Sequence, residues 1–366
     1  MVGSKRLGGC TLIVIFEGEE AIAEQALRRT RTIAAQCGAD ALGEEPARHW
    51  FEHRYSVSYR QAPMFMSGAF VDTMEVAAPW SRLEELYEGI RHALGRHVFV
   101  MAHMSHAYPD GCSIYFTFAG SGRDDADCQS RYEHAWRDAM SAAISAGGTL
   151  SHHHGVGRSK APRMGDEIGL GVELVSAIRR ALDPAEVLNP GNLLPKTPPP
   201  RTPLAPVPDT PLLDKQSQTV HTRGDATLGE VQSTLRAAGL SLGLGDGAPP
   251  PETTVHAWIG AGAPGSPDPW NDPVDHLVAG YSAELVSGAA LNIRPCPRRA
   301  VGPDLFALLL GTEGRVARLH SVHLRAPSCR PFEPLPTTLD RSPPIGSSEQ
   351  LWLDRVFDAA SKVGSV

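Results

Sequence analysis

Three consecutive histidines stand near the middle of the chain, in the phrase Ser151-His-His-His-Gly155. The unperturbed pKa of histidine is ~6.5, so its imidazole transfers protons, binds metals and contacts anions near neutral pH. The preceding residues predict a short strand, which would place His152 and His154 on one face and His153 on the other. From the residues alone, a chemically active cluster and a plain surface run of histidines are equally open.

A second group of reactive side chains lies in a predicted hairpin between residues 102 and 118. His103, His106 and Tyr108 stand at one end of this hairpin, and Tyr115 lies on its returning strand. Imidazole and phenol groups placed together are suited to acid–base chemistry. A tyrosine that is merely half-buried in a strand is the alternative interpretation of Tyr115.

Two further features could contact an anion. Arg60 ends a run of small and aromatic residues, and guanidinium is the usual bidentate partner of phosphate or carboxylate. A glycine-rich turn over residues 260–265 could let the backbone approach a phosphate or a ring system. A solvated strand end and a simple loop are the respective alternatives. The sequence holds no nucleophile elbow, Walker lysine loop, GxGxxG or HExxH motif.

The elements that must position these groups alternate along the first 195 residues. We predict, in order, a strand over 10–16, a helix over 19–35, an extended stretch over 57–76, a helix over 79–94, strands over 97–104 and 112–119, a helix over 125–146, the histidine strand and a helix over 167–182. The helix over 125–146 repeats large side chains every four residues, namely Cys128, Tyr132, Trp136, Met140 and Ile144. This pattern favours an α+β fold, with an antiparallel sheet that carries helices on one face.

Turn formers and prolines divide the chain. Residues 189–195 are rich in turn formers, and residues 196–212 read as a proline-rich linker. We therefore expect a domain over 1–195, the linker over 196–212, a smaller domain over 213–330, and a loop with a helix over 331–366. Within the second part we predict strands over 218–223, 253–259, 281–293 and 316–324, a helix that Thr227 caps together with Glu230, and helices over 303–310 and 348–362.

The composition is that of an ordinary soluble globular protein, with 42% hydrophobic and 20% charged residues among 366. A net charge of −7 argues against nucleic acid as a partner. The six cysteines are scattered without a CxxC pair, which favours a reducing compartment. No apolar run approaches the ~20 residues of a membrane span, and acidic residues follow the first apolar run at once. We therefore expect a cytoplasmic protein without a signal peptide.

Five phrases, taken in order, resemble the C-terminal half of FAD-linked oxidases related to vanillyl-alcohol oxidase. They are RYSVSYR, GAFVDTMEVAAPWSRL, AHMSHAYPDGCSIYFTFAG, GGTLSHHHGVGR and LDPAEVLNPGNLLP, and the resemblance covers about residues 8–195. Within that family they are similar to the alkyldihydroxyacetonephosphate synthases, which start ether-lipid synthesis. The resemblance implies a ferredoxin-like substrate cap over a flavin. It also implies an exchange in which a fatty alcohol replaces the acyl group of acyl-dihydroxyacetone phosphate.

The resemblance assigns roles to individual residues. The catalytic set would be Tyr115, His152, His153 and His154. Arg60 would hold the substrate phosphate, and His106 would contact the substrate. The residues expected to contact FAD are His154, Asn189, Gly260, Gly262 and Gly265.

No metal site is expected from this comparison. Relatives that oxidise 2-hydroxy acids resemble this chain too, but they carry Gly-His-x-Gly-Asp-Gly-Asn-x-His at the hairpin and Glu-His-Gly at the later strand. Those residues can bind a divalent metal. Here Tyr115 stands in place of the second hairpin histidine, and His153 stands in place of the glutamate. The lost carboxylate argues against a metal-dependent oxidation of a hydroxy acid.

The second half resembles the later part of a PCMH-type flavin-binding domain of the same superfamily, which normally precedes the cap. Its phrases are VHTRGDATLGEVQSTLRAAGLSLGL, PETTVHAWIGAGAPG and VGPDLFALLLGTEGRVARLHSVHLRAP. The glycine-rich pyrophosphate loop of that domain is absent from the sequence, and Thr254-Val-His-Ala257 replaces the usual Thr-Val-Gly-Gly. We therefore expect FAD to be held with the help of a separate flavin-binding chain or an upstream segment.

The leading hypothesis is a flavin-dependent chain of the synthase type with a lipid-phosphate substrate. It implies peripheral contact with a membrane and assembly into a homo- or hetero-oligomer. A non-catalytic or decayed subunit of an FAD-linked oxidase complex is the first alternative, and the missing pyrophosphate loop favours it. A 2-hydroxy-acid oxidoreductase of the D-lactate or glycolate type, without the usual metal ligands, is the second alternative.

Overall fold

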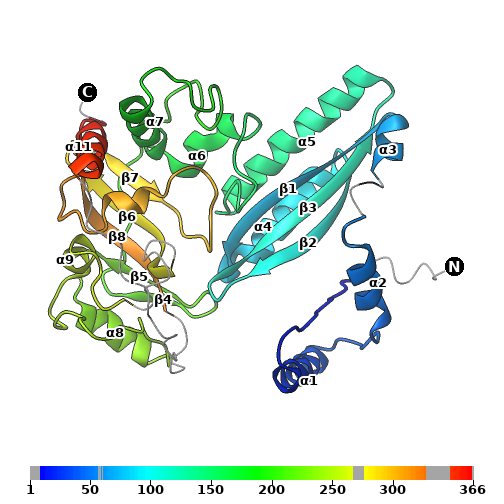
Figure 1. Cartoon of the computed structure of the whole chain (residues 1–366), viewed down its shortest axis with the longest axis horizontal. Helices are drawn as coiled ribbons and strands as arrows, with labels where there is room; N and C mark the ends of the chain where they lie inside the picture. The colour runs from blue at the N-terminus through cyan, green and yellow to red at the C-terminus, as the bar shows by residue number, and fades with distance from the viewer. Residues whose placement is uncertain (1–8, 57–58, 60, 267–275, 327–346, 365–366) are drawn as a thin grey trace. The chain divides into compact units, whose positions relative to one another are not determined.

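The computed structural model describes residues 9–56, 59, 61–266, 276–326 and 347–364 (Figure 1). The chain forms two compact units, residues 1–68 and residues 69–366, which we describe separately. None of the helices in the described ranges is both long enough and apolar enough to span a membrane.

The described part of the first unit contains the helices α1 (Glu20–Gln36), α2 (Glu45–His53) and α3 (Ala62–Met66). Helix α1 confirms the helix predicted over 19–35. The strand predicted over 10–16 is wrong: these residues are irregular, and they pair with none of the described strands. The extended stretch predicted over 57–76 is wrong in its first half, because α3 lies within it.

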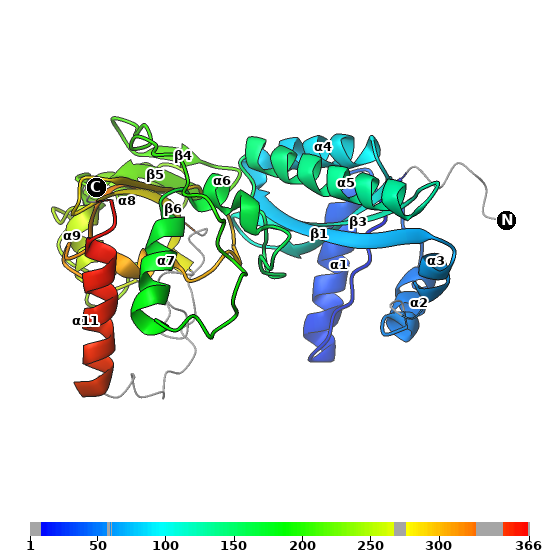
Figure 2. The same ribbon diagram turned by 90° about the horizontal axis from the view of Figure 1, so that it is seen from above.

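The second unit begins with a three-stranded antiparallel sheet, which we call the cap sheet. Its strands are β1 (Ala69–Pro79), β3 (Gly111–Ser121) and β2 (Phe99–Ala107), in that spatial order. Helices α4 (Trp80–Gly95) and α5 (Asp125–Ser145) lie over one face of this sheet (Figure 2). The predicted hairpin and the predicted helices over 79–94 and 125–146 are confirmed.

Successive side chains of a strand point to opposite faces of the sheet, so the two faces of the cap sheet carry different residues. Met74 and Val76 on β1, with Ile114 and Phe116 on β3, are fully buried in the apolar core beneath α4 and α5. Glu75 lies between Met74 and Val76, so its side chain belongs to the face opposite α4 and α5. This face positions the candidate site.

After α5 the chain returns to the cap sheet and turns. Thr149 forms an isolated antiparallel bridge with Ala77. The histidine strand predicted from the sequence is wrong, because residues 152–154 lie in a bend. The helix predicted over 167–182 is split into α6 (Met164–Ile168) and α7 (Gly171–Leu182), because Gly169 adopts a positive φ of 50°.

A second antiparallel sheet of five strands follows, in the order β4-β5-β8-β6-β7. Its strands are β4 (Leu212–Asp214), β5 (Thr219–Arg223), β6 (Val278–Leu285), β7 (Ala290–Ile293) and β8 (Ala317–Arg325). The accompanying helices are α8 (Leu228–Arg236), α9 (Val255–Gly260) and α11 (Ser347–Ser361). These elements confirm the strands predicted over 218–223 and 316–324 and the helix predicted over 348–362.

Local sequence signals explain three further outcomes in this region. The capping box of Thr227 and Glu230 is confirmed at the start of α8. The strand predicted over 253–259 is wrong, because the Thr254 side chain accepts a hydrogen bond from the backbone N–H of Ala257 and starts α9. The strand predicted over 281–293 is a hairpin of β6 and β7, and the helix over 303–310 is a short 3₁₀ turn at Leu305–Leu308.

Two separate apolar clusters form the core of the second unit. One lies between the cap sheet and helices α4 and α5. The other joins the second sheet to α6 and α7, through residues such as Met164, Leu174, Trp258 and Phe306. The predicted α+β class is confirmed, with helices against antiparallel sheets, while the domain limits drawn at residues 195 and 213 stay a prediction.

Candidate functional site

The face of the cap sheet opposite α4 and α5 carries the polar side chains of the candidate site. Glu75 of β1 and His103 of β2 are both register partners of Tyr115 on the central strand β3. Residues directly opposite one another in an antiparallel pair share a face. The three side chains therefore lie in one row across the sheet.

The histidine turn, residues 149–154, is held against this face by backbone hydrogen bonds to Ala77, Glu167 and Glu75. The N–H of Thr149 donates to the carbonyl of Ala77 at 2.9 Å. The N–H of Leu150 donates to Oε2 of the buried Glu167, and the N–H of His153 donates to Oε2 of Glu75, each at 2.9 Å. Two carboxylates thus fix the path of the turn.

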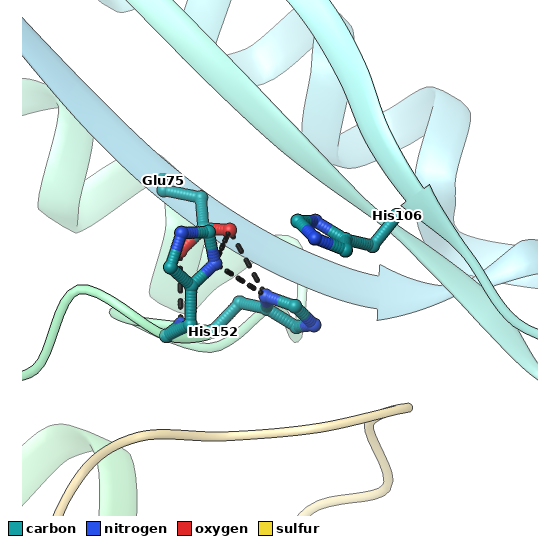
Figure 3. A group of neighbouring side chains, drawn as sticks. Glu75, His106 and His152 are labelled. Carbon is teal, nitrogen blue, oxygen red and sulfur yellow. Dashed lines mark hydrogen bonds and ion pairs between the residues drawn. The ribbon is translucent and has the colours of Figure 1, made fainter.

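Glu75 is completely buried and is the acceptor at the centre of the site (Figure 3). Its Oε1 lies 2.9 Å from Nδ1 of His152 and 2.5 Å from Nδ1 of His153. Burial alone would raise the pKa of Glu75, but hydrogen bonds from His152 and the backbone of His153, together with the charges of both imidazoles, lower it to about 2. The carboxylate is therefore ionised at neutral pH.

His152 links this carboxylate to a phenol. Its side chain is 1% exposed, and its Nε2 lies 2.8 Å from the hydroxyl of Tyr108. Tyr108 is held in turn by the hairpin loop, where its carbonyl accepts a hydrogen bond from the indole N–H of Trp80 at 2.9 Å. The chain Glu75–His152–Tyr108 can pass a proton between a carboxylate and a hydroxyl.

His106 joins the cluster from the edge strand β2. The register of β2 shifts between Met104 and Ala107, and His106 lies within this irregular segment. Its ring centroid lies 5.1 Å from that of His152 and 5.2 Å from that of His153 (Figure 3). Burial and the charges of these two neighbours lower the pKa of His106, which favours its neutral form.

Tyr115 and His154 form a second contact beside the cluster. Their rings meet edge to face with centroids 5.2 Å apart, and His154 also contacts the ring of His153. Burial lowers the pKa of His154. A neutral imidazole beside a phenol can accept a proton from a hydroxyl group of a bound molecule.

The structure thus brings Tyr115, His106 and the three histidines of the turn together. Asn189 is exposed, and its side-chain oxygen accepts a hydrogen bond from the side-chain amide of Asn192. Arg60 lies outside the described residues. The expected separation of His152 and His153 on opposite faces is wrong, because both imidazoles contact Glu75 in the bend.

Of the glycines predicted to contact FAD, Gly260 is the last residue of α9, and Gly262 and Gly265 lie in the turn that follows. A Cβ atom on Gly265 would come within 2.5 Å of the backbone nitrogen of Ala248, and one on Gly260 would meet Glu313 at 3.6 Å. Gly262 has a positive φ of 87°, which a side chain rarely adopts. Packing against Ala248 accounts for Gly265, and the backbone conformation accounts for Gly262, whereas a Cβ atom on Gly260 would make only an ordinary contact.

The sequence did not predict two charged residues of the site, Glu75 and Lys160. Glu75 follows an apolar residue in a strand, and its alternation with Met74 and Val76 was the signal that it faces away from the helices. Lys160 is 5% exposed, and burial lowers the pKa of its ammonium group to about 8. Glu75 and Asp72 are among the acidic groups whose charges act on it.

Comparison with known proteins gives a family match over the first half of the chain. Residues 2–193 match the family described as FAD linked oxidases, C-terminal domain. Alkyldihydroxyacetonephosphate synthase of Dictyostelium discoideum is 27% identical over 194 residues, which are 51% of this chain and 32% of that protein. The synthase of Trypanosoma brucei brucei is 28% identical over 201 residues, 52% of this chain and 33% of that protein.

This chain is also similar, over about half of its length, to a protein whose name gives a different activity. The mitochondrial D-lactate dehydrogenase [cytochrome] of Arabidopsis thaliana is 26% identical over 193 residues, which are 50% of this chain and 33% of that protein. A solved structure of alkyldihydroxyacetonephosphate synthase aligns with a TM-score of 0.34 and 21% identity, over 48% of this chain and 30% of that one. The chain therefore spans about a third of the length of these relatives.

Proposed function

Because the chain belongs, through residues 2–193, to the C-terminal domain family of FAD-linked oxidases, we propose that it is the substrate-binding part of a flavin-dependent enzyme. The proposed reaction exchanges the acyl group of acyl-dihydroxyacetone phosphate for a fatty alcohol. Two relatives named alkyldihydroxyacetonephosphate synthase support it. The observation that carries it is the meeting of Tyr115 and His154 beside the Glu75–His152–Tyr108 chain.

The residues of this chain supply the proton transfers that the exchange needs. A fatty alcohol loses its hydroxyl proton as its oxygen bonds to the substrate carbon, and the acyl group leaves as a carboxylate. His154, whose pKa is lowered, is suited to accept that proton, and Tyr115 is suited to orient the alcohol oxygen. Arg60 and His106 are proposed to bind the phosphate and the neighbouring part of the substrate.

FAD would supply the electron-accepting ring in this family. The glycine turn at residues 260–265 does not fit its pyrophosphate, because a Cβ atom on Gly265 would meet this chain's own backbone at Ala248. We therefore propose that FAD is held mainly by another flavin-binding part, in this or another polypeptide. The proposal includes a cytoplasmic assembly of two or more chains that takes its lipid substrate from a membrane surface.

Reconstitution tests this function directly. The chain is mixed with the flavin-binding polypeptide from the same source and FAD, and the incorporation of labelled hexadecanol is followed together with the release of fatty acid. Tyr115→Phe and His154→Ala are expected to lower the rate by about 100-fold or more, the usual contribution of a positioned acid or base. His92→Ala, an exposed change on α4, serves as the matched control.

Two results would oppose the proposal. The first is a complex that stays colourless with added FAD. The second is a flavin-loaded complex in which Tyr115→Phe and His154→Ala leave the exchange rate unchanged, which would favour a non-catalytic subunit.

The similarity to a D-lactate dehydrogenase supports a second candidate function, the oxidation of a 2-hydroxy acid. The cluster of Glu75 with His106, His152 and His153 is the structural observation in its favour. Turnover of D-lactate or glycolate with a dye as electron acceptor, without exchange of the acyl group, would select it.

A further inference from the structure

We propose that the second half of the chain positions both partners of the Tyr108–His152 hydrogen bond, through Arg325 and residues 294–300. We call residues 294–300 the linking segment; it follows β7 directly. Figure 3 shows a segment of the second half that passes beside the histidine turn. The family match ends at residue 193, so these positioning residues lie outside the part of the chain that it covers.

Arg325, at the end of β8, joins the hairpin turn to the linking segment. Its Nε donates to Oδ2 of Asp110 at 2.7 Å. Its two terminal nitrogens donate to the carbonyls of Val278 at 2.6 Å, Cys296 at 3.0 Å and Pro297 at 2.9 Å. Every nitrogen of this guanidinium therefore donates a hydrogen bond, and the bond to the carboxylate is the charge-assisted kind that holds its partner most firmly.

Asp110 belongs to the four-residue turn that carries Tyr108. The N–H of Tyr108 donates to the carbonyl of Gly111 at 2.8 Å and closes this turn. A Cβ atom on Gly111 would come within 2.9 Å of the Pro297 ring and within 2.3 Å of the Ala78 carbonyl. An ion pair and close packing thus fix the turn to the linking segment, and with it the position of Tyr108.

The linking segment also holds the residues that lead into His152. The N–H of Ala300 donates to the carbonyl of the buried Ser151 at 2.9 Å. A terminal nitrogen of Arg294 donates to the carbonyl of Gly148 at 3.2 Å. Since His152 directly follows Ser151, these bonds fix the backbone from which its imidazole extends.

Glu167 connects the linking segment to the histidine turn a second time. Its Oε2 accepts the backbone N–H of Leu150 at 2.9 Å. The same oxygen lies 3.6 Å from a terminal nitrogen of Arg294, and Oε1 lies 3.5 Å from Nε of Arg299. Two arginines of one short segment thus hold the carboxylate that binds the turn.

The linking segment is itself fixed to the second sheet, so it can act as a rigid support. The N–H of Cys296 donates to the carbonyl of Ala279 on β6 at 3.0 Å. A Cβ atom on Gly280 of the same strand would come within 2.4 Å of the backbone nitrogen of Pro295, so strand and segment are in close contact.

Tyr108 and His152 therefore reach the same support by two separate routes, and their 2.8 Å hydrogen bond depends on both. Displacing two catalytic groups by about 1 Å can lower a rate by about 100-fold. The contribution of this support to catalysis rests on the proposed function, whereas the support itself is a property of the folded chain.

The experiment follows the ring nitrogens of His152 by NMR in the full chain, labelled with nitrogen-15 histidine. The His152 signals are assigned by their loss in His152→Ala. Tyr108→Phe removes the hydroxyl partner and gives the reference movement of the Nε2 signal. We expect Arg325→Met to reproduce this movement, because the released turn no longer holds the phenol against Nε2. Arg325→Lys keeps the charge but loses some of the donors, so we expect an intermediate movement.

Arg318→Met is the matched control, because Arg318 is an exposed arginine on the same strand, and it should leave the His152 signals in place. Asp110→Asn keeps the shape of the turn, removes the charge, and should also move the signals toward those of Tyr108→Phe. It provides the test if Arg325→Met does not unfold cooperatively in urea. Unmoved His152 signals in the folded Arg325 and Asp110 variants would overturn the proposal, as would signals that Tyr108→Phe does not move.

Rate measurements in the reconstituted complex separate this proposal from the proposed function. We expect Arg325→Met to lower kcat by roughly 10- to 100-fold, with a smaller change in KM and partial recovery in Arg325→Lys. Moved His152 signals without a loss of rate would uphold the positioning and contradict the part of the Glu75–His152–Tyr108 chain in the exchange. A loss of rate with unmoved signals would contradict the positioning instead.

Discussion

At the scale of single residues, Glu75 determines what the histidines can do. Its carboxylate accepts from two imidazoles and a backbone N–H, and these bonds hold it ionised in a completely buried position. The sequence predicted the grouping of Tyr115 with the histidines, but it did not indicate Glu75. A charged residue in a strand usually faces water, whereas Glu75 is buried and bonds to His152, which lies 77 residues later in the chain.

The hydrogen bond between Tyr108 and His152 is expected to contribute to the stability of the fold. Tyr108→Phe removes the hydroxyl and leaves Nε2 of the buried imidazole without its partner, so we expect the free energy of unfolding to fall by about 1–3 kcal/mol. Urea denaturation measures the change. Tyr55→Phe, at a residue that is 77% exposed, should shift the free energy by less than about 0.5 kcal/mol. Equal stabilities of the two variants would show that the hydrogen bond is not maintained in solution.

At the scale of elements, periodic patterns predicted the helices and strands of the cap sheet, but not its irregular segments. Helices α4 and α5 and strands β2 and β3 follow from their apolar spacing and alternation. The histidine bend has no such period, because hydrogen bonds to Ala77, Glu167 and Glu75 shape it. The apolar run over 10–16 has a strand-like composition but forms no strand, because none of the described strands pairs with it.

The capping box of α8 predicts a local stability change. Thr227→Ala removes the acceptor for the N–H of Glu230, and we expect a loss of about 1 kcal/mol in thermal or urea unfolding. Thr234→Ala on the same helix is the control, because the Thr234 hydroxyl only bonds back to the carbonyl of Glu230 within the helix. A control that costs as much as Thr227→Ala would mean that the cap adds nothing specific.

A stacked histidine pair between β5 and β8 predicts a dependence on pH. The rings of His221 and His323 are 4.0 Å apart, and burial, with the charge of His221, lowers the pKa of His323 to about 3. The unfolded chain takes up a proton near its ordinary pKa of 6.5, whereas the folded chain resists it. The contribution of His323 to the free energy of unfolding is therefore fully present above pH 6.5, and it is lost as the pH drops toward about 3.

His323→Phe tests this linkage, because phenylalanine keeps an aromatic ring against His221 and cannot be protonated. We expect its free energy of unfolding to fall less steeply below pH 6.5 than that of the unchanged chain, in urea titrations at a series of pH values. Parallel curves for the two proteins would show that His323 does not carry the effect.

At the scale of the whole molecule, the second unit depends on contacts between segments far apart in the chain. The apolar core of the second sheet includes Met164 and Leu174, which precede the proline-rich linker. The linker itself is held against β7, where Asn292 accepts from the N–H of Ala205 and donates to the carbonyl of Pro203. Sequence composition indicates where prolines concentrate, but not whether an extended segment packs on a sheet.

This arrangement predicts the behaviour of a shortened chain. A fragment over residues 69–195 keeps the cap sheet but removes the partners of α6 and α7. We expect it to bind the dye ANS and to lose amide protection in α7, while the fragment over 69–366 does neither, as measured by fluorescence and hydrogen exchange. Full protection of α7 in the shorter fragment would show that this helix packs adequately without the second sheet.

The distance along the chain between Glu75 and His152 also has a consequence for folding. Their contact closes a loop of 77 residues that contains two strands of the cap sheet and both of its helices. Contacts of such long sequence separation form only after the intervening elements have collapsed, because loop closure must first be offset by local structure. We therefore expect the cluster to form late in folding, once β1 and the histidine turn have reached their final places.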